Sequence, residues 1–331
     1  MPQSEISGTK RKFPPVPFNA GILYIQSAEC YNFNHQKKEE ETMDGKVYAQ
    51  VYSLIRVERD GLIDALKEFS RIGYDGVEIV SDNSGGLSLD EFNTLLKELN
   101  LDVIAIHGWG SDAEINMAKA CGIKYLAFDA SLKDYKRETV LNVCKELNEK
   151  GQKIKDLGMK LTIHNHADEF LWVEGEEGKT RVYDLLLSET DPELVGFQLD
   201  VGWATLAGAD VCDYIEKNPG RFPLIHVKEC DHVATDPVEF EHFPPEIVKQ
   251  IKRDEHGAPI FTDEIKAQLY ETRSWNKGLG QGIVDWKRLV DLANAQGCDA
   301  FISEREYYHF DGSDGTAISA AEFDYNFLRS L

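Results

Sequence analysis

The sequence lacks the features of secreted, membrane-spanning and nucleic-acid-binding proteins. Its six cysteines form no CxxC pair, and a chain of 331 residues needs no disulfides to hold its core, so we expect reduced thiols and a cytoplasmic location. No run of 18 apolar residues occurs, which argues against a transmembrane helix. The 36 basic residues are outnumbered by 58 acidic ones, and the net charge of −22 disfavours nucleic acid and membrane surfaces as partners.

Residues 1–42 differ in composition from the rest of the chain. They contain a Pro-rich stretch, Phe13–Phe18, and a charged run, Lys37–Glu41, which is followed by Met43. Codons for Lys-Lys-Glu-Glu-Glu can spell a purine-rich ribosome-binding sequence. We therefore interpret residues 1–42 either as a translated leader or as an N-terminal extension that wraps the catalytic domain or meets a partner, and we assign residues 43–331 to that domain.

Strand signals alternate with helix signals from Met43 onward. Apolar residues recur at helical spacing in Asp60–Ile72, and Ser88 with Glu91 forms the capping-box pattern at the start of a helix over Ser88–Leu99. Eight strand–helix units in about 290 residues predict an α/β fold, a (β/α)₈ TIM barrel in one domain. A doubly wound sheet is the alternative, but no GxGxxG follows the first strand. The predicted strands are Val47–Ile55, Gly76–Val80, Val103–His107, Tyr125–Asp129, Leu161–His166, Val195–Val201, Pro223–Lys228 and Ala300–Glu304.

A long connection, residues 229–281, separates the seventh predicted strand from its helix. Two stretches within it, Pro245–Arg253 and Thr262–Thr272, have helical patterns. An insertion after a barrel strand lies at the catalytic face, where it can form a lid or a subunit contact. A homo-oligomer or a small accessory subunit would dock there.

Polar and titratable residues occupy the ends of seven predicted strands. Buried parallel strands are normally apolar, and uncompensated polar burial costs roughly 2 kcal/mol or more per group. Because the carboxyl ends of barrel strands meet at one mouth, a shared metal ion would remove this cost. The residues are Glu78, His107, Asp129, His164, His166, Asp200, His226, Lys228, Glu304 and Glu306.

The most economical ligand set is His164, Asp200, His226 and Glu304, from neighbouring strands five to eight. Two imidazoles and two carboxylates suit one divalent ion, with Mn²⁺ favoured and Zn²⁺, Co²⁺, Fe²⁺ or Mg²⁺ as alternatives, although Mg²⁺ prefers oxygen ligands. Such an ion polarises a carbonyl and stabilises an enediolate. The site therefore predicts a substrate that offers a hydroxyl and a carbonyl to the ion.

Five segments of the chain resemble the sugar phosphate isomerase/epimerase family, which has the xylose-isomerase-like barrel. They are GYDGVE (Gly73–Glu78), IHNHADEF (Ile163–Phe170), LDVGWATLAGAD (Leu199–Asp210), PGRFPLIHVK (Pro219–Lys228) and GLGQGIVDW (Gly278–Trp286). The resemblance covers roughly Val47 to Leu331 and implies the same four metal ligands and a small sugar or keto-sugar as substrate. Its endonuclease relatives make a metal-dependent nuclease a remote alternative, which the acidic charge disfavours.

The resemblance also implies roles for the surrounding residues. His164 stands where many members carry glutamate, which places the chain in an HNH-type subgroup and disfavours epimerisation by two opposed carboxylates. Glu304 is the expected base, and His166, Glu169 or Lys228 would supply a second proton-transfer group. Elimination from a 3-keto-glycoside, as in the barrel subunit of a C-glycoside deglycosidase, is the alternative. The expected substrate contacts are Glu78, His107, Trp109, Trp203 and Glu169.

Four of these residues have structural interpretations beside the functional ones. His107 could serve the structure as readily as it could contact substrate. Glu78 could pair with an arginine such as Arg56 and brace the barrel. Trp109 and Trp203 could belong to the core, although an indole also offers a stacking face for a sugar ring. A non-catalytic sugar-binding barrel remains the third class of function, and the complete ligand set disfavours it.

Overall fold

The computed structural model describes residues 45–54, 61–175, 178–235, 244–253, 259–260, 262–307 and 315–331. Residues 1–42, predicted to be a leader or extension, lie outside the described residues. Arg56, the proposed partner of Glu78, lies outside them as well.

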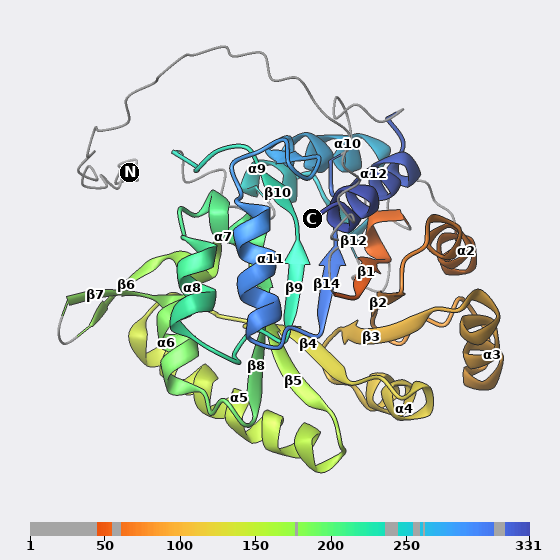
Figure 1. Cartoon of the computed structure of the whole chain (residues 1–331). Coiled ribbons are helices and arrows are strands. Elements are labelled where there is room, and N and C mark those ends of the chain that lie inside the picture. Colours follow the sequence, from red (N-terminus) through yellow and green to blue (C-terminus); the bar gives the residue numbers. More distant parts are fainter. Residues whose placement is uncertain are drawn as a thin grey trace, which may run out of the picture. The chain divides into compact units, whose positions relative to one another are not determined.

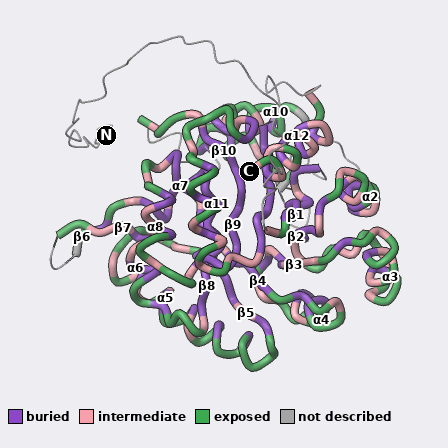
Figure 2. The backbone as a smooth tube through the Cα atoms, in the orientation of Figure 1, coloured by how far each residue is buried: buried purple, intermediate pink, exposed green. Residues whose placement is uncertain are grey.

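Eight parallel strands close into a barrel, which confirms the predicted fold and excludes the doubly wound sheet (Figure 1). The sheet closes because β1 pairs with both β14 and β2, with Tyr48 opposite Ile302 on one side and Gly76 on the other. The strands are mostly buried (Figure 2), as expected for parallel strands covered by helices. In barrel order they are β1 (Val47–Gln50), β14 (Ala300–Ser303), β9 (Leu224–Val227), β8 (Val195–Asp200), β5 (Lys160–His164), β4 (Tyr125–Asp129), β3 (Asp102–His107) and β2 (Gly76–Val80).

Amphipathic helices cover the barrel. In α3, Phe92 and Leu96 are buried, and Ser88 and Glu91 form the capping box predicted from the sequence. The strand predicted over Val47–Ile55 is shorter, because residues 52–54 are already helical. The helices around the barrel are α2 (Leu62–Ile72), α3 (Leu89–Leu99), α4 (Asp112–Cys121), α5 (Arg137–Asp156), α6 (Val182–Glu189), α7 (Val201–Leu206), α8 (Val211–Lys217), α11 (Trp286–Ala295) and α12 (Ala317–Arg329).

Two elements are added to the barrel: a hairpin that projects at the left of Figure 1 and an insertion that lies beyond the tips of the β9 and β14 arrows. A hairpin of β6 (Trp172–Gly175) and β7 (Gly178–Arg181) follows the short 3₁₀ helix η1 (Asp168–Phe170). The insertion after β9 contains α9 (Pro245–Val248) and α10 (Asp263–Glu271), which confirms two helical segments there, each shorter than predicted. Its small strands are β10 (Glu229–Cys230) with β13 (Asn276–Lys277), and β11 (Lys252–Arg253) with β12 (Pro259–Ile260).

Glu229 fastens the two ends of the insertion together. Its carboxylate is fully buried and accepts hydrogen bonds from Trp286 Nε1 at 2.6 Å, from the Gly280 backbone N–H at 2.9 Å and from the Cys230 backbone N–H at 3.0 Å. Asn276 adds a bond from its side-chain amide to the Glu229 carbonyl at 3.0 Å. The residue after Lys228 is thus held by the turn that leads into α11.

Two expectations from composition are consistent with the described residues. Cys121, Cys144, Cys212, Cys230 and Cys298 are all free thiols. Within the described ranges, no helix combines the length and the apolar character needed to cross a membrane.

Candidate metal and active site

Three predicted metal ligands converge inside the mouth of the barrel. β5 ends at His164, β8 ends at Asp200, and His226 lies one residue before the end of β9. The register places Asp200 directly beside His226 on the neighbouring strand. One ligand atom from each residue lies within 4.8 Å of the others, and all three side chains are buried. The strand ends therefore create a site with the donor types that a divalent metal prefers.

Asp200 offers an oxygen to this centre. Its Oδ1 caps α7 by accepting the Trp203 backbone N–H at 2.9 Å. Its Oδ2 is buried and has no aligned hydrogen bond from any described group, although Lys228 Nζ approaches it as an ion pair at 3.1 Å. His164 Nε2 and His226 Nδ1 both lie 3.9 Å from it. A buried anionic oxygen facing two ring nitrogens fits a cation-binding position.

Glu304, the fourth predicted ligand, follows directly after β14 and lies beside His226, but the cluster of ligand atoms found among the described residues contains only the other three. Its Oε2 lies 2.9 Å from His226 Nδ1 and 3.3 Å from Lys228 Nζ. Burial opposes ionisation of this carboxyl, but the charges of Lys228 and His226 outweigh it and hold its pKa well below the usual range. Glu304 is therefore an ionised group that can bind a metal or accept a proton.

Lys228 lies among three carboxylates. Its ammonium is 1% exposed and lies 3.1 Å from Asp200 Oδ2 and 3.1 Å from Glu306 Oε2, in addition to Glu304. Burial alone would lower the pKa of this lysine, but the three carboxylates raise it above the ordinary value. A permanently charged amine is a poor base, so the contacts favour an electrostatic role over proton abstraction.

Glu78 reaches across the barrel interior from β2. Its side chain is 0% exposed. Oε1 lies 2.9 Å from His226 Nε2 and accepts a hydrogen bond from Gln50 Nε2 at 2.5 Å. Oε2 accepts a hydrogen bond from Gln198 Nε2. His107 Nδ1 lies 3.6 Å from Oε1. Burial opposes ionisation, but the two histidines outweigh it and lower the pKa of Glu78. Both oxygens are occupied by protein groups, which differs from the substrate contact expected from the sequence.

The histidines form a cluster of tilted and edge-to-face rings beside this carboxylate. The ring of His164 lies 4.8 Å from His107, 4.6 Å from His226 and 5.0 Å from His166. Burial, together with the neighbouring rings of His226 and His107, lowers the pKa of His164 to about 3, so this imidazole is neutral and has a lone pair for a metal. Burial also lowers the pKa of His107, but Asp129, 3.2 Å away, and Glu78 outweigh it and raise the value to about 10.

Glu169 is a second carboxyl near the mouth. It lies in η1, is 7% exposed and accepts the His166 backbone N–H at 2.8 Å. Burial raises the pKa of Glu169 from 4.5 to about 7. A carboxyl group whose pKa lies near 7 can both donate and accept a proton at neutral pH.

The two tryptophans expected to meet a sugar ring differ in exposure. Trp203 is 1% exposed, and its ring packs against Trp275 at 4.7 Å and lies under the guanidinium of Arg273 at 5.1 Å. Its face is therefore covered by the insertion and not open to a ligand. Trp109, in the loop between β3 and α4, is 66% exposed and remains available for stacking.

Two residues of this site were not found from the sequence. Gln198, two residues before Asp200, connects Glu78 with His164; a lone glutamine inside a strand has no motif that would mark it. Arg273 comes from the insertion, and its Nε lies 3.6 Å from Glu306 Oε2. Its place follows from the path of the insertion, which sequence spacing does not predict.

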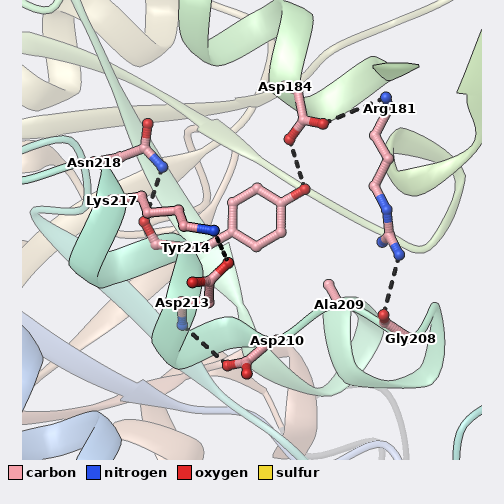
Figure 3. A pocket seen from close by; sticks show the side chains of 9 residues that line it. All are labelled: Arg181, Asp184, Gly208, Ala209, Asp210, Asp213, Tyr214, Lys217 and Asn218. Atoms are coloured by element: carbon pink, nitrogen blue, oxygen red, sulfur yellow. Dashed lines mark hydrogen bonds and ion pairs between the residues drawn. The ribbon is translucent and has the colours of Figure 1, made fainter. Parts of the chain in front are cut away.

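A polar cavity of about 300 Å³ lies elsewhere, between α6 and α8 (Figure 3). Tyr214 donates a hydrogen bond to Asp184 at 2.7 Å across it, and Lys217 pairs with Asp213 at 2.7 Å. None of the predicted site residues borders this cavity, so it does not contribute to the metal centre. It is lined by Arg181, Asp184, Gly208, Ala209, Asp210, Asp213, Tyr214, Lys217 and Asn218.

Known proteins are similar to this chain in sequence and in fold. Inosose dehydratase of Geobacillus thermodenitrificans is 23% identical over 161 residues, which are 48% of this chain and 45% of that protein, so the match spans less than half the length of this curated relative. A sugar phosphate isomerase/epimerase from Parabacteroides distasonis superposes with a TM-score of 0.63 at 17% identity, covering 88% of this chain and 96% of that one. The IolI protein, solved with a bound zinc atom, has a TM-score of 0.55 at 14% identity, with 85% and 95% covered.

The family described as xylose isomerase-like TIM barrel matches residues 66–331, which is most of the chain. This match and the closed eight-stranded barrel agree with the resemblance seen in the five sequence segments. The chain therefore belongs to the xylose isomerase-like TIM barrel family.

Proposed function

We propose that this protein is a divalent-metal-dependent carbohydrate enzyme that removes a proton next to the carbonyl of a sugar or keto-sugar. The observation that carries the proposal is the convergence of ligand atoms from His164, Asp200 and His226 within 4.8 Å of one another, beside Glu304. These four residues would hold the ion, which supplies Lewis acid chemistry to the carbonyl. The mixed donor set suits Mn²⁺, our first choice, or Zn²⁺, Co²⁺ and Fe²⁺, with Mg²⁺ as a further candidate.

Proton transfer is assigned to the carboxyl groups at the mouth. Glu304 is ionised and is our leading base. Glu169, with its pKa raised by burial to about 7, is the better second proton-transfer group, because Lys228 is held in its charged form by three carboxylates. His166 and His107 would contact substrate oxygens, and exposed Trp109 would stack on the sugar ring.

Metal content and proton exchange together test the proposal. Protein purified without chelator should contain about one divalent ion per chain, and keto-sugars incubated with it in heavy water should gain deuterium next to the carbonyl. Asp200→Ala should lose both properties, whereas Asp156→Ala, on the exposed end of α5, should keep both. A metal-free Asp200→Ala protein with full turnover would contradict the proposal.

Elimination is the second candidate reaction. His164 stands where a two-carboxylate epimerase needs glutamate, and a one-base elimination needs no second carboxylate on the opposite face. The relative from Geobacillus thermodenitrificans is a dehydratase, which supports a reaction of this type. A lyase acting on a 3-keto-glycoside, with a small accessory subunit, is one form of it. An unsaturated ketone that accumulates during turnover distinguishes elimination from epimerisation, and a small co-purifying protein would favour the glycoside lyase.

A further inference from the structure

A hydrogen-bond relay runs from Glu78 through Gln198 to His164. Gln198 is fully buried in β8; its Nε2 donates to Glu78 Oε2, and its Oε1 lies 2.9 Å from His164 Nδ1. An ionised carboxylate only accepts hydrogen bonds, so the amide must turn its NH₂ toward Glu78 and its oxygen toward His164. Nδ1 of His164 therefore has the hydrogen, and the lone pair lies on Nε2, the nitrogen that faces Asp200.

The same carboxylate orients the second histidine. His226 Nε2 lies 2.9 Å from Glu78 Oε1, so Nε2 donates. The other nitrogen, Nδ1, lies 2.9 Å from the ionised Glu304 carboxylate and donates to it as well, so the metal-free ring has a hydrogen on both nitrogens. Nδ1 also lies 3.9 Å from Asp200 Oδ2, and a metal ion bound there would displace its hydrogen. One buried glutamate thus leaves Nε2 of one histidine and Nδ1 of the other turned toward the same aspartate oxygen.

Glu78 is itself held in place. In the barrel order β2 lies opposite β8, so the side chain of Glu78 spans the interior to reach Gln198. Gln50 Nε2 donates to Glu78 Oε1 at 2.5 Å, and Gln50 Oε1 accepts the Tyr52 backbone N–H at 3.2 Å. The Glu78 end of the relay is therefore anchored to the backbone through Gln50.

We propose that Glu78 and Gln198 are positioning residues that fix which ring nitrogen of His164 and of His226 faces the metal ion. The inference rests on the proposed metal site and deepens it. Partners of this kind, bonded to the distal nitrogen of a ligating histidine, set its tautomer and orientation, and their loss weakens metal binding by about 10- to 100-fold. Glu78 then acts behind the ligands and not on the substrate.

Nitrogen–hydrogen correlation spectra of ¹⁵N-histidine-labelled protein test the relay without any metal. At pH 7 the metal-free wild-type protein should show His164, assigned by its loss in His164→Asn, as the Nδ1–H tautomer. Gln198→Met removes both relay bonds at nearly constant volume and should give a mixture of tautomers. Gln50→Met, which removes a bond to Glu78 but none to a histidine, should leave the His164 tautomer unchanged.

Zinc affinity, measured by chelator competition, provides the second readout. Gln198→Met should weaken Zn²⁺ binding by about 10- to 100-fold, and Gln152→Met, on the exposed face of α5, should have no effect. Three results would each overturn the inference. They are an Nε2–H tautomer of His164 in the wild type, an unchanged spectrum in Gln198→Met, and equal losses of zinc affinity in Gln198→Met and Gln50→Met. If Gln198→Met does not fold, the wild-type and Gln50→Met spectra still decide it. If no variant binds zinc but the wild-type tautomer is Nδ1–H, the metal proposal fails while the relay stands.

Discussion

Oε2 of Glu304 lies 2.9 Å from Nδ1 of His226, so the proposed base and a proposed metal ligand are in direct contact. A proton taken up by Glu304 would therefore alter the charge at the metal centre as well. Some side chains around Glu304 are proposed to bind the metal ion and others to transfer protons. Substituting them one at a time should therefore change metal content and proton exchange separately.

Replacing Glu304 with glutamine should affect proton transfer more than metal content. The amide keeps an oxygen for the ion but cannot accept the proton, so exchange next to the carbonyl should fall by about 10²- to 10⁴-fold. Deuterium incorporation into a keto-sugar and metal analysis on the same sample measure the two effects. Glu98→Gln, on the exposed surface of α3, is the matched control. An unchanged exchange rate in Glu304→Gln would remove Glu304 as the base.

Lys228→Met should destabilise the fold because it leaves three buried carboxylates without their cation. Removing one partner from a buried ion pair costs about 3 to 5 kcal/mol, and we expect a loss in this range from urea unfolding of metal-free protein. Lys217→Met removes the lysine of an exposed pair with Asp213 and should cause no measurable loss. Equal stability of the Lys228 and Lys217 variants would show that Lys228 does not hold the carboxylates together.

Glu169 should make stability depend on pH in a defined direction. Its pKa is raised in the folded protein from 4.5 to about 7, so the folded state binds this proton more tightly than the unfolded state. The contribution is fully present below pH 4.5 and is lost as pH rises through about 7. The shift corresponds to a loss on the order of 3 kcal/mol across this window.

Glu169→Gln tests this dependence, since the amide retains an oxygen for the His166 backbone N–H and does not titrate. Relative to this variant, the wild type should lose free energy of unfolding steadily from pH 4.5 to 7. Parallel stability profiles of the two proteins would show that Glu169 titrates at an ordinary value.

His164→Glu should make the fold depend on metal. The new carboxylate would join Glu78, Asp200 and Glu304 and would face the oxygen of Gln198, so metal-free protein should lose about 2 kcal/mol or more of stability. Added Mn²⁺ or Zn²⁺ should recover this loss in a thermal unfolding assay. His164→Gln, which is neutral, should show no such metal-dependent recovery, and identical behaviour of the two variants would contradict the charge argument.

The barrel and the meeting of three metal-competent side chains at its mouth could be predicted because both follow from local patterns. Parallel buried strands are short apolar runs, and a polar residue at the end of such a run stands out, as with His164, Asp200 and His226. The ends of the strands are harder to predict. Val47–Ile55 is rich in β-forming residues, but β1 ends at Gln50 and residues 52–54 are helical. Local preference alone does not locate that turn.

The parts of the site that could not be predicted depend on contacts across the barrel. Gln198 acquires its role only because β8 faces Glu78 on β2, and neither residue's neighbours in the sequence indicate this pairing. Trp203 follows the strand end as a sugar-stacking residue would, but the insertion brings Trp275 and Arg273 over its ring. The path of a long insertion is decided by packing and not by periodicity.

Glu229 fixes the two ends of the insertion, residues 229–281, beside the proposed active site. Because this carboxylate binds the turn at Gly280 and the indole of Trp286, the departure and return points of the insertion are fixed next to Lys228. The part of the insertion that precedes Arg273 can change in length and composition, whereas Arg273 and Asn276 must stay because both contact Glu306. We therefore expect that this part of the insertion can vary during evolution, and substrate preference with it, without changes in the barrel strands.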